Sequence, residues 1–225
     1  MSWESSVLYE KIINETVRDR LGGVASADLI IRPFNFSDIE RLQAAGQWDE
    51  AGAVLARAAA ALEVVGAEAI VLCTNTMHQV AEAIEAAVSI PLLHIVDATG
   101  RAIREAGVKR VALLGTRYTM EQPFYRDALA QRYDLDVIVP SKQARETIHH
   151  IIYDELVQGV INPVSKDQVM EIISRMSREV GITGVIAGCT EIELLVTPDD
   201  IDSDYFPTTT LHAQYAAHFA LEGGE

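Results

Sequence analysis

Two cysteines are the residues of this chain best suited to acid–base chemistry. Cys73 ends an apolar run that starts at Ala69, and Cys189 follows Gly188 at the end of a second apolar run. A threonine comes next in both places. Unpaired N–H groups at a helix amino terminus favour a thiolate, so we expect the pKa of each thiol to fall from about 8.5 toward neutrality. One such cysteine is usually a small buried hydrophobe, whereas a matched pair favours a proton-transfer site.

Hydroxyl and amide side chains follow both cysteines and are suited to binding a carboxylate. Thr76 and Gln79 have capping-box spacing, which predicts a helix that runs through Ala87. Glu191 starts the second predicted helix, where it is either a partner of the helix dipole or a site residue. The candidate donors are the first polar residues after each cysteine: Thr74, Asn75, Thr76 and Thr190.

Short β-branched runs alternate with longer helical segments along the chain. Examples are the run 27–31, the helical stretch from Asp49 to Val65, and the run 69–73. This alternation predicts an α/β protein with parallel sheets flanked by helices. The further candidate strands are residues 92–96, 110–114, 136–139, 184–187 and 205–206.

A repeated pattern divides the chain into two similar halves. Each half has a helix, a strand, a Cys–Thr pair, another helix and a later short strand. Open α/β sheets place ligands at the carboxyl ends of their strands, so two facing lobes would bring the cysteines across one cleft. We expect residues 1–97 with 208–225 to form lobe 1 and residues 98–207 to form lobe 2.

Charge and composition exclude several classes of partner. The formal net charge of -15 repels a phosphate backbone, so we expect no nucleic acid. The chain has no apolar run of membrane-spanning length, and residues 1–4 lack the features of a signal peptide, so we expect no membrane association and a cytoplasmic location. Two cysteines and six scattered histidines do not have zinc spacing, so we expect no metal and place the histidines at the surface.

Longer stretches around the cysteines are similar to a known family. Residues 73–78, Cys-Thr-Asn-Thr-Met-His, and 188–192, Gly-Cys-Thr-Glu-Ile, resemble the two signature motifs of the aspartate/glutamate racemases. Residues 1–5, 114–120 and 211–213 also match. The resemblance covers essentially the whole chain. It is closest to the bacterial branch that includes aspartate/glutamate-specific and broad-specificity amino-acid racemases.

The resemblance implies two pseudo-symmetric α/β lobes, an active site between them without metal or pyridoxal cofactor, and a homodimer. It implies that one thiolate of Cys73 and Cys189 removes the α-proton of a small-molecule amino acid while the other thiol protonates the opposite face. Such a site must stabilise carbanionic charge with preorganised donors and hold reacting atoms within about 3 to 3.5 Å.

The resemblance implies roles in substrate binding for several other residues, each of which also has a simpler structural interpretation. Thr116, Tyr118 and Thr119 are similar to a substrate-contacting loop, although an ordinary polar loop would look the same. Lys166 stands where relatives often carry a basic residue that could meet a substrate carboxylate, but a lone lysine is more often solvated. Gln43 and Arg117 are weaker candidates for recognition of the substrate side chain.

Two departures from the family pattern affect these expectations. Relatives usually begin with a β-strand and a Gly-Gly pair ahead of the segment that matches residues 1–3, and both are absent here. Loss of that central strand should expose strand edges and remove core from lobe 1. Pro207 stands where the family typically has an aspartate and where the first half has Asp97, which could impair binding of the substrate ammonium group.

Several functions remain compatible with these features. The first is racemisation of aspartate, glutamate or a broader amino-acid set. Hydantoin racemisation and maleate isomerisation are related alternatives, whereas arylmalonate decarboxylase-like chemistry would be expected to retain only one of the cysteines. A non-catalytic amino-acid-binding protein is the alternative of a different class, because the missing strand and Pro207 could leave binding without turnover.

Overall fold

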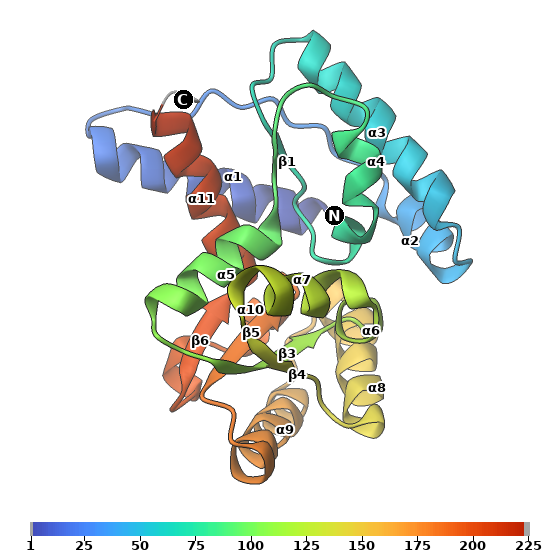
Figure 1. Ribbon diagram of the computed structural model, residues 1–225, viewed down its shortest axis with the longest axis vertical. Helices are drawn as coiled ribbons and strands as arrows, with labels where there is room; N and C mark the ends of the chain where they lie inside the picture. Colours follow the sequence, from blue (N-terminus) through green and yellow to red (C-terminus); the bar gives the residue numbers. More distant parts are fainter. Residues whose placement is uncertain (1, 223–225) are drawn as a thin grey trace. The chain divides into compact units, whose positions relative to one another are not determined.

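The computed structural model describes residues 2–222 and divides into two compact units. Unit 1 comprises Met1–His94 with His212–Glu225, and unit 2 comprises Ile95–Leu211. The sequence predicts that the boundaries between the two lobes lie at residues 97/98 and 207/208. No helix among the described residues is long and apolar enough to cross a membrane. Figure 1 shows the course of the chain through each unit.

Unit 1 is built on a small parallel sheet of two strands, which pair Ile70 with Leu92 and Val71 with Leu93. Helices account for most of the rest of the unit (Figure 1). Its elements are α1 (Trp3–Leu21), α2 (Phe36–Ala44), α3 (Trp48–Val64), β1 (Ile70–Val71), the 3-10 helix η1 (Thr76–Val80), α4 (Ala81–Glu85), β2 (Leu92–Leu93) and the part of α11 (Thr208–Glu222) from His212 onward.

Two apolar clusters fill unit 1. Every fourth residue of α1 is buried at Tyr9, Ile13 and Val17, so this helix presents one apolar stripe, which packs with alanines of α11. The second cluster joins α2, α3 and η1 through residues such as Ile39 and Leu55. Each cluster includes residues of the strand region 69–73, which therefore has core on both faces, as parallel sheets require.

Unit 2 has a parallel sheet of four strands in the order β4-β3-β5-β6. Crossover helices connect these strands, which gives the expected α/β layering (Figure 1). Its elements are α5 (Ile95–Glu105), β3 (Arg110–Gly115), α6 (Arg117–Glu121), α7 (Pro123–Tyr133), β4 (Asp136–Ile138), α8 (Lys142–His150), the π-helix η2 (Ile151–Glu155), the 3-10 helix η3 (Leu156–Gln158), α9 (Pro163–Val180), β5 (Gly184–Gly188), α10 (Ile192–Leu195), the 3-10 helix η4 (Pro198–Asp200), β6 (Asp204–Pro207) and the start of α11.

Two glycines allow the central strands of unit 2 to end in close contact. Gly115 and Gly188 are register partners at the carboxyl ends of β3 and β5. A Cβ on Gly115 would lie 2.7 Å from the Gly188 carbonyl oxygen, and a Cβ on Gly188 would lie 2.9 Å from the Leu114 carbonyl oxygen. Any side chain at either position would therefore force the two strand ends apart.

The prediction of an α/β protein with parallel sheets and flanking helices is confirmed, and four local predictions need correction. Residues 27–31 have no regular secondary structure and belong to no strand, because no strand among the described residues pairs with them. The strand predicted over 69–73 is regular only at residues 70–71. The strand predicted over 92–96 ends at Leu93, since α5 starts at Ile95. The helix predicted to run from Thr76 through Ala87 is a 3-10 turn followed by α4, which ends at Glu85.

Candidate active site

Each unit holds one candidate cysteine within two residues of the carboxyl end of a parallel strand. Cys73 lies two residues beyond β1 and is partly exposed, and its thiol donates to the Val71 carbonyl oxygen at 3.5 Å. Cys189 follows β5 and is buried, and its thiol donates to Glu191 Oε2 at 3.0 Å. Both cysteines are free thiols. They therefore occupy the position in their own sheets where open α/β folds place ligands.

Both thiols resist ionisation, which corrects the expectation of lowered pKa values. Burial raises the pKa of Cys73 to about 11. Burial, followed by the neighbouring charge of Glu191 and the hydrogen bond to it, holds the pKa of Cys189 well above its usual range. The helices after them are a 3-10 turn and the four-residue α10, so the favourable dipole is small and desolvation dominates. Both environments therefore favour the neutral thiol over the thiolate.

The polar residues after Cys73 form a buried loop held in place by a histidine. Thr74, Asn75 and Thr76 are all buried. His78 Nδ1 lies 2.7 Å from the Thr74 carbonyl oxygen, and because a carbonyl only accepts, this nitrogen donates. Burial and the nearby His94 and His212 hold the pKa of His78 well below its usual range. The loop therefore rests on a neutral imidazole.

Gln43 belongs to the same neighbourhood in unit 1. It is buried on α2 and donates through Nε2 to Met77 Sδ at 2.9 Å. Met77 lies in η1, immediately after the Cys73 loop. The loop region also contains Gln79, whose Oε1 atom is buried without a hydrogen-bond partner in the described chain. A buried acceptor of this kind can bind a ligand donor.

Unit 2 brings most of its candidate residues together at one end of the sheet. Thr190 and Glu191 are buried beside Cys189, and Thr116 follows the adjacent strand β3. The Thr116 hydroxyl accepts from the Thr119 backbone N–H at 3.3 Å and caps α6. Thr119 Cβ would lie 3.2 Å from a Cβ on Gly115, so this threonine packs against the strand ends next to Cys189.

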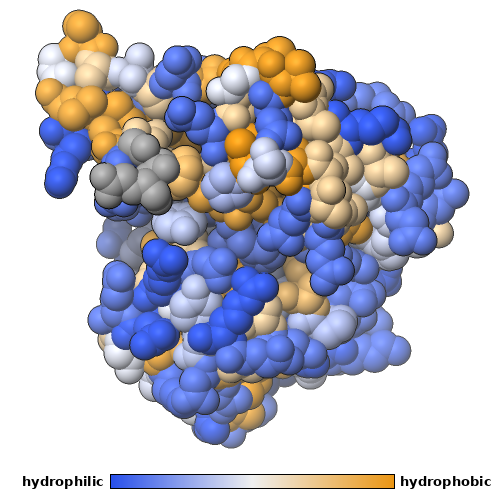
Figure 2. Space-filling view, turned by 45° about the horizontal axis from the view of Figure 1, so that its top comes forward, coloured by the Kyte–Doolittle hydropathy of each residue, from blue (hydrophilic) through white to orange (hydrophobic). Residues whose placement is uncertain are grey.

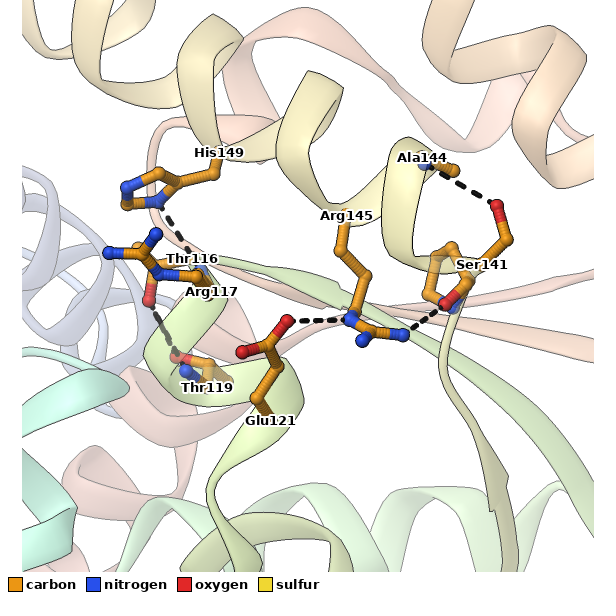
Figure 3. A network of polar contacts seen from close by, with 9 residues as sticks. Thr116, Arg117, Thr119, Glu121, Ser141, Ala144, Arg145 and His149 are labelled. Carbon is orange, nitrogen blue, oxygen red and sulfur yellow. Dashed lines mark hydrogen bonds and ion pairs between the residues drawn. The ribbon is translucent and has the colours of Figure 1, made fainter.

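A polar network fixes α6 against α8. Figure 3 shows the Thr116 and Thr119 hydroxyls facing each other, and their oxygens are 3.2 Å apart. The backbone N–H of Arg117 donates to His149 Nδ1 at 3.3 Å, and Arg145 Nε donates to Glu121 Oε1 at 2.9 Å (Figure 3). The loop after β3 is therefore held at both ends of α6.

Tyr118 and Arg117 lie at the outer side of this network. The Tyr118 ring is partly buried and stands edge-to-face with His149, with the ring centroids 6.1 Å apart. The guanidinium carbon of Arg117 is 5.7 Å from the centroid of the Tyr118 ring. These contacts give the Tyr118 ring a defined position on α6.

Lys166 is engaged in a different interaction. Its Nζ lies 2.8 Å from Asp200 Oδ1. The hydrogen bond from Lys166, together with those from Thr197, lowers the pKa of Asp200 to about 2. The structure therefore ties this cation to η4, outside the Cys189 and Thr116 group of contacts.

Sequence reasoning missed a carboxylate and a hydroxyl near Cys189. Glu193, in α10, accepts from the Thr209 backbone N–H at 2.7 Å through Oε1 and interacts with Thr210 Oγ1 at 3.2 Å through Oε2. Thr209 Oγ1 is buried and has no hydrogen-bond partner within the described residues. The signal in the sequence was present: Glu193 lies two residues after Glu191, and the threonines follow Pro207.

The placement of the histidines at the surface is wrong for two of them. His78 and His212 are buried. His212 donates through Nε2 to the Leu93 carbonyl oxygen at 2.6 Å, so its Nδ1 accepts from the Tyr9 hydroxyl at 2.8 Å. No group of three or more His, Cys, Asp or Glu side chains in residues 2–222 is arranged to hold a metal ion.

Comparison with known proteins decides the family. The model of the Asp/Glu/Hydantoin racemase family matches residues 1–216. The chain belongs to this family. The chain is similar to an Asp/Glu racemase family protein from Yersinia pestis whose crystal structure is known. The two sequences are 47% identical, the TM-score is 0.91, and the match covers 98% of this chain and 95% of that chain. A Pyrococcus horikoshii aspartate racemase homologue is 32% identical, with a TM-score of 0.84, over 97% and 94% of the two chains.

Curated relatives in the racemase family are more distant. The broad specificity amino-acid racemase RacX of Bacillus subtilis is 26% identical over 164 residues, which is 69% of this chain and 65% of that protein. A glutamate racemase from Actinobacillus pleuropneumoniae is 25% identical over 56% of this chain and 46% of that protein. The chain thus spans less than two thirds of the length of either curated relative.

Proposed function

We propose that this chain is an amino-acid racemase that acts on aspartate, glutamate or a broader set of amino acids without a cofactor. The observation that carries the proposal is the matched position of the two cysteines. Each compact unit has one free thiol within two residues of the carboxyl end of a parallel strand, followed by a threonine and further buried polar groups. Membership of the racemase family supports the proposal that this pair transfers protons.

The proposed mechanism uses one thiolate and one thiol on opposite faces of the α-carbon. The thiolate removes the α-proton and becomes a thiol, and the electron pair of the C–H bond stays on the substrate as a carbanion. The opposite thiol donates its proton to the carbanion and becomes a thiolate. Atoms and charge balance, and the enzyme ends with the protonation states of Cys73 and Cys189 exchanged.

Neutral resting thiols make activation the difficult step. Cys189 already donates its proton toward Glu191 Oε2 at 3.0 Å, so we propose that Glu191 accepts this proton when the thiolate forms. A substrate ammonium group brought close to the sulfur would also favour the thiolate, because an opposite charge within about 4 to 6 Å stabilises the ionised form.

The threonine-rich loops supply the proposed stabilisation of the carbanion. Thr74, Asn75, Thr76 and Thr190 are assigned to the substrate carboxylate, together with backbone N–H groups. In other enzymes the loss of one such preorganised donor costs about 100- to 1,000-fold in rate. Thr116 and Thr119 are assigned to the same group because they lie beside the Cys189 end of the sheet.

Recognition of the substrate side chain is assigned to residues farther from the thiols. Gln43 and Tyr118 are the proposed contacts, each held by a defined neighbour. Lys166 is a proposed contact only if it leaves Asp200, which currently binds it. We also propose a cytoplasmic homodimer, supported by the free cysteines and by the family resemblance.

A second candidate is a non-catalytic amino-acid-binding protein. The observation that favours it is the raised pKa of both thiols, and Cys189 also packs in an apolar cluster. A protein that bound aspartate through the threonine loops but held its thiols neutral would show affinity without inversion.

One experiment separates the two candidates. The protein, dialysed against a chelator and given no pyridoxal phosphate, is incubated in deuterium oxide with each L-amino acid. Chiral chromatography measures the D-enantiomer, and NMR measures the loss of the α-proton. Racemisation of aspartate, glutamate or another amino acid supports the first proposal. Calorimetric binding of an amino acid without exchange or inversion supports the second and overturns the first.

A further inference from the structure

One imidazole of unit 2 is held with its proton on a known nitrogen. His149 Nδ1 accepts the backbone N–H of Arg117 at 3.3 Å, so the proton of the neutral ring is on Nε2. This Nε2 atom has no hydrogen-bond partner among residues 2–222. The ring also contacts two aromatic rings, with centroid distances of 6.1 Å to Tyr118 and 4.7 Å to Tyr153. The ring is therefore held in position, and its Nε2–H group can donate to a ligand.

The guanidinium group of Arg117 lies beside this donor. Figure 3 shows the Arg117 side chain next to the His149 ring, and the positive charge of Arg117 is one of the causes that lower the pKa of His149. The guanidinium carbon is 5.7 Å from the centroid of the Tyr118 ring, a cation–π contact that restricts its movement. A permanent cation and a neutral N–H donor are thus held next to each other.

No carboxylate in the described part of the chain forms an ion pair with Arg117. The two carboxylates whose charge acts on the imidazole have other partners, since Glu121 binds Arg145 at 2.9 Å and Asp154 binds His150 at 3.1 Å. The chain has 33 acidic residues and 18 Lys and Arg residues, and Figure 2 shows a largely hydrophilic surface over unit 2. In so acidic a protein, an unpaired cation beside a fixed N–H donor indicates a site for an anion.

This pair of donors lies near the Cys189 end of the sheet. Arg117 is two residues after Gly115, whose register partner Gly188 directly precedes Cys189. Three Cα steps of about 3.8 Å and one strand spacing of about 4.8 Å connect Arg117 with Cys189, so their Cα atoms are at most about 16 Å apart. The long arginine side chain can cover part of this path. A substrate whose α-carbon lies at the Cys189 thiol can therefore extend its own side chain toward Arg117.

We propose that Arg117 and His149 bind a carboxylate at the end of the substrate side chain, and that His149 is a specificity-determining residue. The inference rests on the proposed racemase function and narrows its substrates to amino acids with an acidic side chain. A carboxylate can accept from the guanidinium and from Nε2–H together, because its two oxygens offer about four acceptor positions. An amide or alkyl side chain would leave the charge of Arg117 unpaired.

The charges around His149 give a measurable signature of binding. Desolvation, followed by the charges of Arg117 and His150, lowers the pKa of His149. The charges of Asp154 and Glu121 oppose this shift. A bound carboxylate adds negative charge beside the ring, so binding should raise this pKa. NMR of the His149 ring against pH measures the change, and the signal is assigned by its absence in His149→Phe.

The first test uses the unmodified chain and requires no activity. L-Aspartate, L-glutamate, L-asparagine and inorganic phosphate are added separately, and the titration midpoint of His149 is measured with each. We expect both acidic amino acids to move the midpoint to higher pH and asparagine to leave it in place. An unchanged midpoint with both acidic amino acids overturns the inference. An equal shift with inorganic phosphate at the same concentration also overturns it, because the site would then bind anions in general.

The second test measures turnover of L-aspartate by two variants. Arg117→Gln removes the cation, and His149→Phe removes the donor but keeps a ring against Tyr118. Each should lower kcat/KM by about 10- to 100-fold, which corresponds to the loss of one hydrogen bond to a charged group. Arg117→Lys keeps the charge and should recover part of this loss, which it would not do if the defect were only structural.

Two matched controls remove the same residue types nearby. Arg126→Gln on α7 and His150→Phe on α8 change side chains that already have acidic partners, and both should keep kcat/KM close to the parent value. A value equal to the parent's in both Arg117→Gln and His149→Phe overturns the inference. A chain that shows the midpoint shift with aspartate but turns over no amino acid supports the carboxylate site and contradicts only the racemase function.

Discussion

Glu193 Oε1 accepts a hydrogen bond of 2.7 Å from the backbone N–H of Thr209. A carboxylate from α10 therefore caps the first turn of α11, the position where a helix dipole favours negative charge. Burial opposes this effect and raises the pKa of Glu193 to about 7, although the hydrogen bonds from Thr209 and Thr210 lower it. Desolvation outweighs the cap, so this carboxyl titrates near neutral pH.

The raised pKa of Glu193 predicts a loss of stability as pH rises. The folded state keeps a proton that an unfolded glutamate, with its pKa near 4.5, has released. The contribution is complete below about pH 4.5 and is lost as pH rises through about 7, with a size on the order of 3 kcal/mol. Glu193→Gln keeps an acceptor for Thr209 and should abolish this loss. Urea unfolding of both proteins at about pH 5 and about pH 8 measures the difference. Identical pH dependence in the two proteins would contradict the prediction.

The hydrogen bond between Tyr9 and His212 predicts a stability loss on removal of one hydroxyl. Tyr9→Phe leaves the buried Nδ1 of His212 without its donor, which should lower the free energy of unfolding by about 1 to 3 kcal/mol. Denaturant unfolding measures this loss. A double-mutant cycle with His212→Leu is the control, because the effect of Tyr9→Phe should shrink when the imidazole is absent. Equal losses in both backgrounds would show that packing alone is responsible.

The proposed two-thiol mechanism predicts complementary defects. Cys73→Ser and Cys189→Ser should each abolish racemisation, because each leaves only one effective base. In deuterium oxide each variant should still exchange the α-proton of one enantiomer, and the two variants should prefer opposite enantiomers of aspartate. NMR of L- and D-aspartate measures the exchange. Interconversion of the enantiomers by either variant at close to the parent rate would contradict the two-thiol mechanism and would indicate that both cysteines are structural.

The contact between Cys189 and Glu191 predicts a shift in thiol titration. After burial, the charge of Glu191 and its hydrogen bond are the groups that hold the pKa of Cys189 above its usual range. Glu191→Gln in a Cys73→Ser background should therefore move the midpoint of thiolate formation to lower pH. Ultraviolet absorbance of the thiolate against pH measures this. Glu193→Gln in the same background is the matched control, and an equal shift in it would rule out the specific contact.

Local patterns predicted the central strands of unit 2 well. The runs at 110–114 and 184–187 are short, apolar and β-branched, and they form β3 and β5 within one residue. Residues 27–31 have the same pattern but form no strand. A segment forms a β-strand only if another strand pairs with it, and the sequence of the segment alone does not reveal such a partner. The prediction of a strand over residues 92–96 is wrong for another reason, because α5 begins at Ile95.

The candidate site was predictable in residue type but not in electrostatics. The motifs around Cys73 and Cys189 indicated the buried polar loops that the structure contains. The sequence predicts that the pKa of each thiol is lowered, which is wrong. Helix length and burial decide the direction of this shift, and both depend on the folded structure. His78 and His212 were missed for the same reason. Scattered histidines look exposed until distant segments such as α1 and α11 close around them.

The discontinuity of unit 1 has a consequence for synthesis of the chain. Unit 2 is a single continuous segment, so it can complete its core as soon as it leaves the ribosome. The apolar stripe of α1 packs with Ala213, Ala216 and Ala217, which are made only after the whole of unit 2. His212, the partner of Tyr9, arrives equally late. We therefore expect the apolar stripe of α1 to stay uncovered until α11 has been translated.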